Sequence, residues 1–128
     1  MKNLIMAVDF DGTIVQDAYP NIGKINYKTV GYIKRHQEHG AKLILWTCRS
    51  GSHLEEAIKV CNGLGIRFDA INDNLPEIKE KYGNNSRKIY ADVYLDDRAF
   101  IPVEKYMEEV KIPEPTEVEL IEMSLQWN

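Results

Sequence analysis

Four short apolar runs, separated by helical patterns, constrain this chain more than any other feature of its sequence. The first run ends in an acid, the second in a hydroxyl and the fourth in an acidic pair. We expect strands over residues 3 to 9, 42 to 47, 68 to 71 and 89 to 95. Strands alternating with helices predict an α/β fold, a three-layer Rossmann-like sandwich with a mostly parallel sheet.

Two helices are predicted between the first three runs. Asn26 can cap a helix over residues 27 to 39, where apolar residues recur every three to four positions. Ser52 with Glu55 predicts a capping box, and the apolar spacing then continues to residue 64.

The segment from residue 12 to residue 25 has no apolar period and is rich in turn formers. It predicts an exposed loop or small hairpin that flaps over a site at the end of the first strand. The polar stretch from 72 to 88 predicts at most a helical turn, near residues 76 to 82.

Size and charge favour one domain. The chain has 128 residues, 44% of them hydrophobic, which fits a single core over residues 1 to 102. Residues 103 to 128 hold seven Glu and two Lys, so this acidic tail carries a charge of −5. The whole chain has a net charge of −4, so the body carries +1. A nearly neutral body argues against a broad basic surface for duplex nucleic acid.

The tail ends in a predicted helix with a thin apolar stripe of Val118, Ile121 and Leu125. The stripe can dock on the body or on a second subunit. The second alternative would make the protein a homo-oligomer, and the sequence does not choose between the two. The apolar start is five residues long before Asp9, too short for a signal sequence or a membrane span. We therefore expect a cytoplasmic protein without membrane contact.

Polar side chains gather at the strand ends. In parallel sheets ligands bind beyond the carboxyl ends of the strands, and Asp9, Thr47 and Asp96 each stand at such an end. Asp9 and Asp11 are two positions apart and face the same way in an extended segment. Together with Asp96 and Asp97 they form an oxygen-only donor set suited to Mg²⁺.

The turn after Asp11 suits a phosphate. Gly12 permits a tight turn that brings backbone amides close to an anion, and the Thr13 and Thr47 hydroxyls can add donors. A nearby lysine would complete the charge balance. The residues therefore predict a site for magnesium and a phosphate group.

These residues resemble, in order, the four motifs of the haloacid dehalogenase superfamily. The motifs are the run from Asp9 to Thr13, then Thr47, a later lysine, and the pair Asp96-Asp97, so the likeness spans residues 3 to about 100. An acid at Asp11 is typical of the phosphatases of that superfamily. The short connections resemble its capless members, which implies an open site. Such a site either accepts the end of a macromolecule or relies on a subunit partner to exclude water, and we expect a phosphorylated small molecule or a nucleic-acid end as substrate.

The resemblance implies a role for each residue. Asp9 would attack phosphorus to give an aspartyl-phosphate, and Asp11 would protonate the leaving oxygen and then activate water. Thr47 would bind the phosphoryl group. Asp96 and Asp97, with the Asp9 carboxylate and the Asp11 backbone carbonyl, would hold Mg²⁺.

The implied lysine is best matched by Lys88, eight residues before Asp96, with Lys79 and Lys81 as alternatives on the same segment. Thr47-Cys48-Arg49 and Asp96-Asp97-Arg98 also resemble runs in the 3′-phosphatase half of phage-type polynucleotide kinase-phosphatases. Arg49 would then clamp a phosphate. Polynucleotide 3′-phosphates, nucleotides and sugar phosphates all remain candidate substrates.

Two other classes fit part of the pattern. A signalling receiver domain also combines an acidic pair, a phosphorylated Asp, a Thr and a Lys, but it has the acidic pair on its first strand, whereas here the pair comes last. A module that binds magnesium or phosphate without turnover would keep the same site. Asp11 argues for chemistry, because binding alone does not require it.

Overall fold

The computed structural model describes residues 4–99, 116–118, 121 and 125. The chain divides into two compact units, Met1–Arg98 and Ala99–Asn128. In the second unit Glu117, Val118, Ile121 and Leu125 are helical, as predicted for the tail. The rest of the predicted final helix, and the predicted boundary after residue 102, lie outside the described residues.

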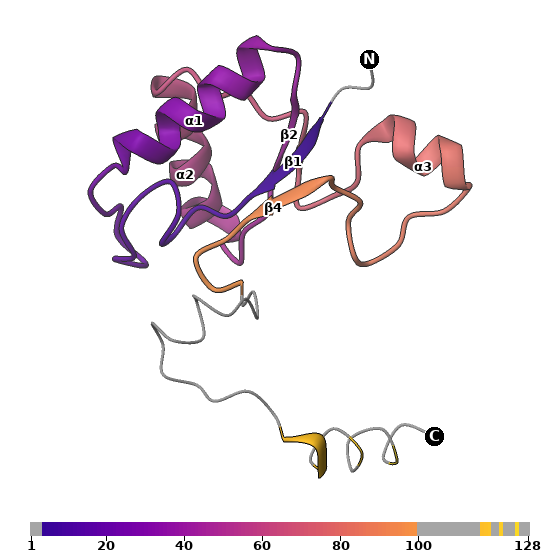
Figure 1. The fold of residues 1–128 in the computed structure, drawn as a ribbon. Coiled ribbons are helices and arrows are strands. Elements are labelled where there is room, and N and C mark those ends of the chain that lie inside the picture. Colours follow the sequence, from indigo (N-terminus) through magenta and orange to yellow (C-terminus); the bar gives the residue numbers. More distant parts are fainter. Residues whose placement is uncertain (1–3, 100–115, 119–120, 122–124, 126–128) are drawn as a thin grey trace. The chain divides into compact units, whose positions relative to one another are not determined.

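A four-stranded parallel sheet forms the centre of the first unit, as predicted. Its strands are β1 (Ile5–Val8), β2 (Lys42–Leu45), β3 (Ala70–Ile71) and β4 (Val93–Leu95). Their order is β3-β2-β1-β4, with β1 parallel to both of its neighbours (Figure 1). The chain moves outward from β1 to β3 and then returns to the other side of β1, so the direction of winding reverses at β1. Such a switch point is where open α/β sheets bind ligands.

Three helices complete the sandwich: α1 (Tyr27–Glu38), α2 (Gly51–Gly63) and α3 (Pro76–Tyr82). Because side chains alternate along a strand, Met6 and Val8 pack with the core residues of α1 and α2, while Ile5 and Ala7 pack with those beside α3. The helices therefore cover opposite faces of the sheet, as Figure 1 shows. This α/β three-layer arrangement confirms the predicted fold class.

The two predicted helix starts had different outcomes. Asn26 caps α1 as predicted, and its side-chain oxygen accepts the Thr29 amide N–H at 3.4 Å. The capping box at Ser52 is wrong, because α2 already begins at Gly51 after the N-cap Ser50, which makes no side-chain capping bond. Ser52 therefore lies inside the first turn, where it cannot act as the cap.

The last strand is shorter than predicted, because its first residues bind elsewhere. The Tyr90 amide N–H donates to the side-chain oxygen of buried Asn74 at 2.7 Å, and Ile89 packs with Leu75 next to α3. The register of β4 with β1 runs from Val93 to Leu95, and the Asp92 N–H just before it donates to the Ile5 carbonyl at 2.8 Å. The predicted helical turn, by contrast, is confirmed as α3.

The predicted loop over residues 12 to 25 is closed by its own backbone. The Gln16 N–H donates to the Lys24 carbonyl at 2.8 Å, and a Cβ on Gly23 would lie 1.9 Å from the Gln16 carbonyl oxygen. Glycine is therefore required for this close approach. We call residues 16 to 24 the site loop. In the described part of the chain, no helix is both long and apolar enough to cross a membrane.

Candidate metal and phosphate site

Asp9 follows β1 and lies at the switch point of the sheet. Its backbone N–H donates to the Leu95 carbonyl at 2.9 Å, which continues the pairing of β1 with β4. The Thr13 hydroxyl donates to Asp9 Oδ2 at 3.1 Å and accepts the Asp97 N–H at 3.2 Å. A single hydroxyl thus joins the end of β1 to the acidic pair that follows β4.

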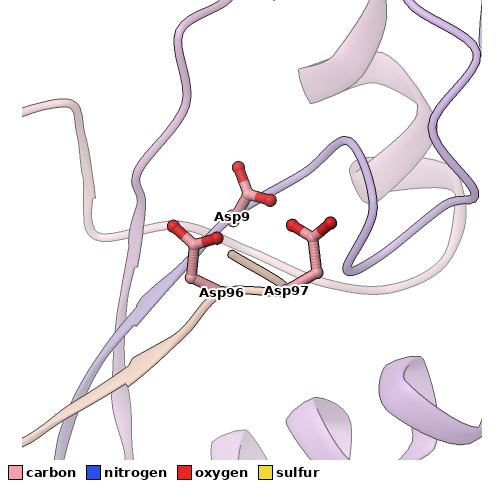
Figure 2. Close-up of side chains that lie close together, drawn as sticks. All are labelled: Asp9, Asp96 and Asp97. Carbon is pink, nitrogen blue, oxygen red and sulfur yellow. The ribbon is translucent and has the colours of Figure 1, made fainter. Parts of the chain in front are cut away.

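Three predicted carboxylates come together here. Asp9, Asp96 and Asp97 each offer an oxygen, and these oxygens lie within 4.8 Å of one another (Figure 2). Asp9 is half-buried, and the other two are exposed. Carboxylate oxygens at this spacing are the donor set that hard divalent cations prefer.

The electrostatics of the cluster also suit a cation. Burial, the charge of Asp96 and a hydrogen bond with Asp97 raise the pKa of Asp9 from 3.8 to about 7. Three carboxylates so close repel one another unless a proton or a cation neutralises them. A bound Mg²⁺ would offset that repulsion and keep Asp9 ionised, so the residues fit the predicted metal.

Asp11 points its side chain elsewhere. Both of its oxygens accept hydrogen bonds from Arg49, with Nε to Oδ2 and Nη2 to Oδ1 each at 2.7 Å. Among the described residues, the side chain of Asp11 is not part of the acidic cluster. The predicted contribution of Asp11 to the metal, its backbone carbonyl, stays a prediction.

Arg49 lines the cavity over the cluster but uses its side chain in contacts within the protein. It is buried, at 2% exposed, and its five N–H groups all have acceptors: the two oxygens of Asp11 and the carbonyls of Pro20, Asn21 and His53. A guanidinium whose donors are all used has none left for a phosphate. The structure therefore gives no support to Arg49 as a phosphate clamp.

Thr47 stands beyond β2 as predicted. Its N–H donates to the Asn72 side-chain oxygen at 2.8 Å, and its hydroxyl accepts the Arg49 N–H at 3.1 Å. Asn72 follows β3 and has a positive φ of 52°, which asparagine tolerates better than most residues. Asn72 was not predicted as a site residue, although it directly follows the third apolar run of the sequence.

Two of the candidate lysines, Lys88 and Lys79, lie in different places. Lys88 lines a cavity of about 500 Å³ beside α3, together with Tyr82 and Tyr94, and Asp9 does not line that cavity. Lys79 Nζ lies 2.5 Å from Asp73, the residue that follows Asn72. The structure thus does not bring Lys88 to the acidic cluster, and Lys79 lies next to the end of β3.

A cavity of about 580 Å³ opens over the cluster. Asp9, Asp11 and Asp96 line it with Thr47, and the site loop adds Asp17 and Tyr19. Arg98 lies at its rim with a side chain 80% exposed and 3.3 Å from Asp17. The loop was predicted to cover the site, but Tyr19 was missed, since an isolated aromatic in a turn-rich segment gives no signal of its own.

Comparisons with known proteins find that the chain is similar to a solved structure. No protein-family model matches it, and no curated protein does. A structure titled as that of a conserved protein coded by a locus from Bacteroides thetaiotaomicron matches with 37% sequence identity and a TM-score of 0.69. The match covers 93% of this chain and 98% of the other. The chain therefore belongs to the family of this conserved Bacteroides protein.

Proposed function

We propose that the protein is a magnesium-dependent phosphomonoester hydrolase that acts through an aspartyl-phosphate on Asp9. The observation that carries the proposal is the cluster of Asp9, Asp96 and Asp97, with Asp11 two residues from the nucleophile and lining the same cavity. The order of the motifs, which resembles that of haloacid dehalogenase phosphatases, supports the same assignment.

The residues divide the reaction into two displacements. Asp9 attacks phosphorus, the bond from phosphorus to the ester oxygen breaks, and a protonated Asp11 gives its proton to that oxygen. Asp11 then takes a proton from water, the water oxygen attacks phosphorus, and the bond to Asp9 breaks. Mg²⁺ held by the three clustered carboxylates would balance the negative charge of the phosphoryl group.

The surroundings of the cavity support an organic phosphate as substrate. Exposed Tyr19 and Arg98 lie at the cavity, an aromatic ring and a cation that suit a ligand with both an apolar part and a negative charge. We propose a nucleotide, a sugar phosphate or a polynucleotide 3′-phosphate, and a screen of these three classes separates them.

An aryl phosphate assay with and without Mg²⁺ tests the reaction. We expect turnover with the metal, none after chelation, and none in Asp9→Asn, which keeps the shape of the side chain but not its nucleophilic oxygen. Full activity in that variant would reject the mechanism. Mg²⁺ binding without turnover on any phosphate ester would indicate the alternative, a module that binds metal without catalysis.

A further inference from the structure

Arg49 connects three segments that are distant in the sequence. Its side chain starts just beyond β2, pairs with Asp11 after β1, and reaches carbonyls in the site loop and in the first turn of α2. The guanidinium lies 5.0 Å from the Phe10 ring centroid and 5.2 Å from that of Tyr19. It is thus enclosed by rings as well as by hydrogen bonds.

These contacts fix the position and charge of Arg49. The hydrogen bonds with Asp11 raise the pKa of Arg49 above its ordinary value, so the group stays charged. The fork of the guanidinium matches a carboxylate in one plane and holds both oxygens at once. Because its other three N–H groups bind backbone carbonyls, the fork cannot turn without breaking them.

We propose that Arg49 is a positioning residue for Asp11, and that the site loop holds Arg49 in place for this purpose. Arg49 holds one oxygen of Asp11 with Nε and the other with Nη2, each at 2.7 Å, so the ion pair fixes the direction of the Asp11 carboxyl group. The pair therefore prepares Asp11 for the second displacement, in which water attacks the phosphorylated Asp9. This role rests on the proposed hydrolase function.

The role differs from a phosphate clamp in what it predicts. A clamp contacts the substrate, so its loss raises KM. A positioning residue for the water-activating base slows only hydrolysis of the intermediate, so kcat falls while the first displacement continues. With an aryl phosphate, whose leaving group needs little help from an acid, the variant should then accumulate phosphorylated enzyme.

Rapid-quench kinetics on Arg49→Lys and Arg49→Gln test this. We expect a burst of phenol close to one equivalent of enzyme, followed by turnover slower by on the order of ten- to a hundredfold, a part of what general acid–base catalysis supplies. Asp11→Asn should show the same burst, and adding Arg49→Gln to it should slow turnover no further. Arg87→Gln, which changes an exposed arginine, is the matched control and should behave like the wild type.

Amide hydrogen exchange gives a readout that needs no turnover. Residues 16 to 24 should exchange faster in Arg49→Lys than in the wild type or in Arg87→Gln, because the lysine ammonium cannot reach the same carbonyls together. Burst size is expressed per active enzyme, so partial unfolding of a variant does not obscure it.

The two proposals fail in different ways. If the wild type turns over through Asp9, but the Arg49 variants lose the burst together with turnover or raise KM alone, the positioning role is overturned and the hydrolase stands. If amide hydrogen exchange of residues 16 to 24 is unchanged in Arg49→Lys, the proposal that the site loop holds Arg49 in place is overturned. A wild type that hydrolyses no phosphate ester overturns the proposed function, and the positioning role with it.

Discussion

Gly12 lies so close to Asp97 that a Cβ on Gly12 would stand 2.2 Å from Asp97 Oδ2. Gly12 also has a φ of +93°, which side chains other than glycine rarely adopt. The sequence suggests that this glycine lets a phosphate approach. The structure adds that the glycine leaves room for a carboxylate of the acidic cluster.

Gly12→Ala should therefore damage the cluster directly. The new methyl group displaces Asp97 and strains the backbone by about 1 to 2 kcal/mol, so we expect weaker Mg²⁺ binding and a large loss of activity. Calorimetric titration with Mg²⁺ measures the first effect.

Gly31→Ala is the control for Gly12→Ala. A Cβ on Gly31, in α1, would meet nothing within 4 Å, and the change should stabilise the fold by up to about 1 kcal/mol with Mg²⁺ binding unaltered. Equal Mg²⁺ affinity in the two variants would contradict the assigned role of Gly12.

Thr13→Val should loosen the link between Asp9 and Asp97 without changing the size of the side chain. The variant loses the hydrogen bond to Asp9, which lowers the pKa of that carboxyl, and leaves the Asp97 N–H without its acceptor. We expect a loss of about 1 kcal/mol in the free energy of unfolding and weaker Mg²⁺ binding.

Thr13→Ser keeps the hydroxyl and should recover most of both properties. Urea unfolding and Mg²⁺ titration of the two variants provide the comparison. If the serine variant is as impaired as the valine variant, the hydroxyl is not what matters at this position.

The sequence predicted the parts of the site that depend on strand ends. Asp9, Thr47 and Asp96 lie where they do because apolar runs form parallel strands, whose carboxyl ends share one edge. The ion pair of Arg49 with Asp11 could not be predicted from the positions of the strand ends. The pairing with Asp11 depends on the path of the site loop, because Pro20 and Asn21 supply carbonyls that no sequence pattern marks.

The fold was predictable to a similar depth. The parallel sheet and the three layers followed from the alternation of elements, whereas the strand order was not predicted, and a single buried side chain decided where the last strand begins. The side chain of Asn74 binds the Tyr90 N–H. The start of the apolar run, which begins at Ile89, therefore does not join the sheet as a strand. The same segment carries Lys88, which lines the cavity beside α3.

The stability of the metal-free protein should fall as Asp9 ionises. The pKa of Asp9 in the folded protein, about 7, is above its ordinary value of 3.8, so folding favours the protonated form. The stability that this group contributes is therefore complete below about pH 3.8 and is lost as the pH rises through 7.

Urea unfolding in chelator between pH 4 and 8 measures this loss as the difference between the wild type and Asp9→Asn. We expect the difference to shrink for a metal-bound protein, because a cation favours the ionised carboxylate. A difference that stays constant over this pH range would show that Asp9 ionises normally in the fold.

The two cysteines should differ in reactivity because of where they lie. Cys61 is fully buried in α2, and burial raises its pKa to about 12, whereas Cys48 is exposed beside Thr47. The thiolate is the reactive form, so an aromatic disulfide reagent at pH 8 should titrate Cys48 quickly and leave Cys61 unmodified. Denaturant should release the second thiol, and Cys48→Ser should remove the first. Rapid modification of both thiols in the native protein would mean that α2 does not pack against the sheet as described.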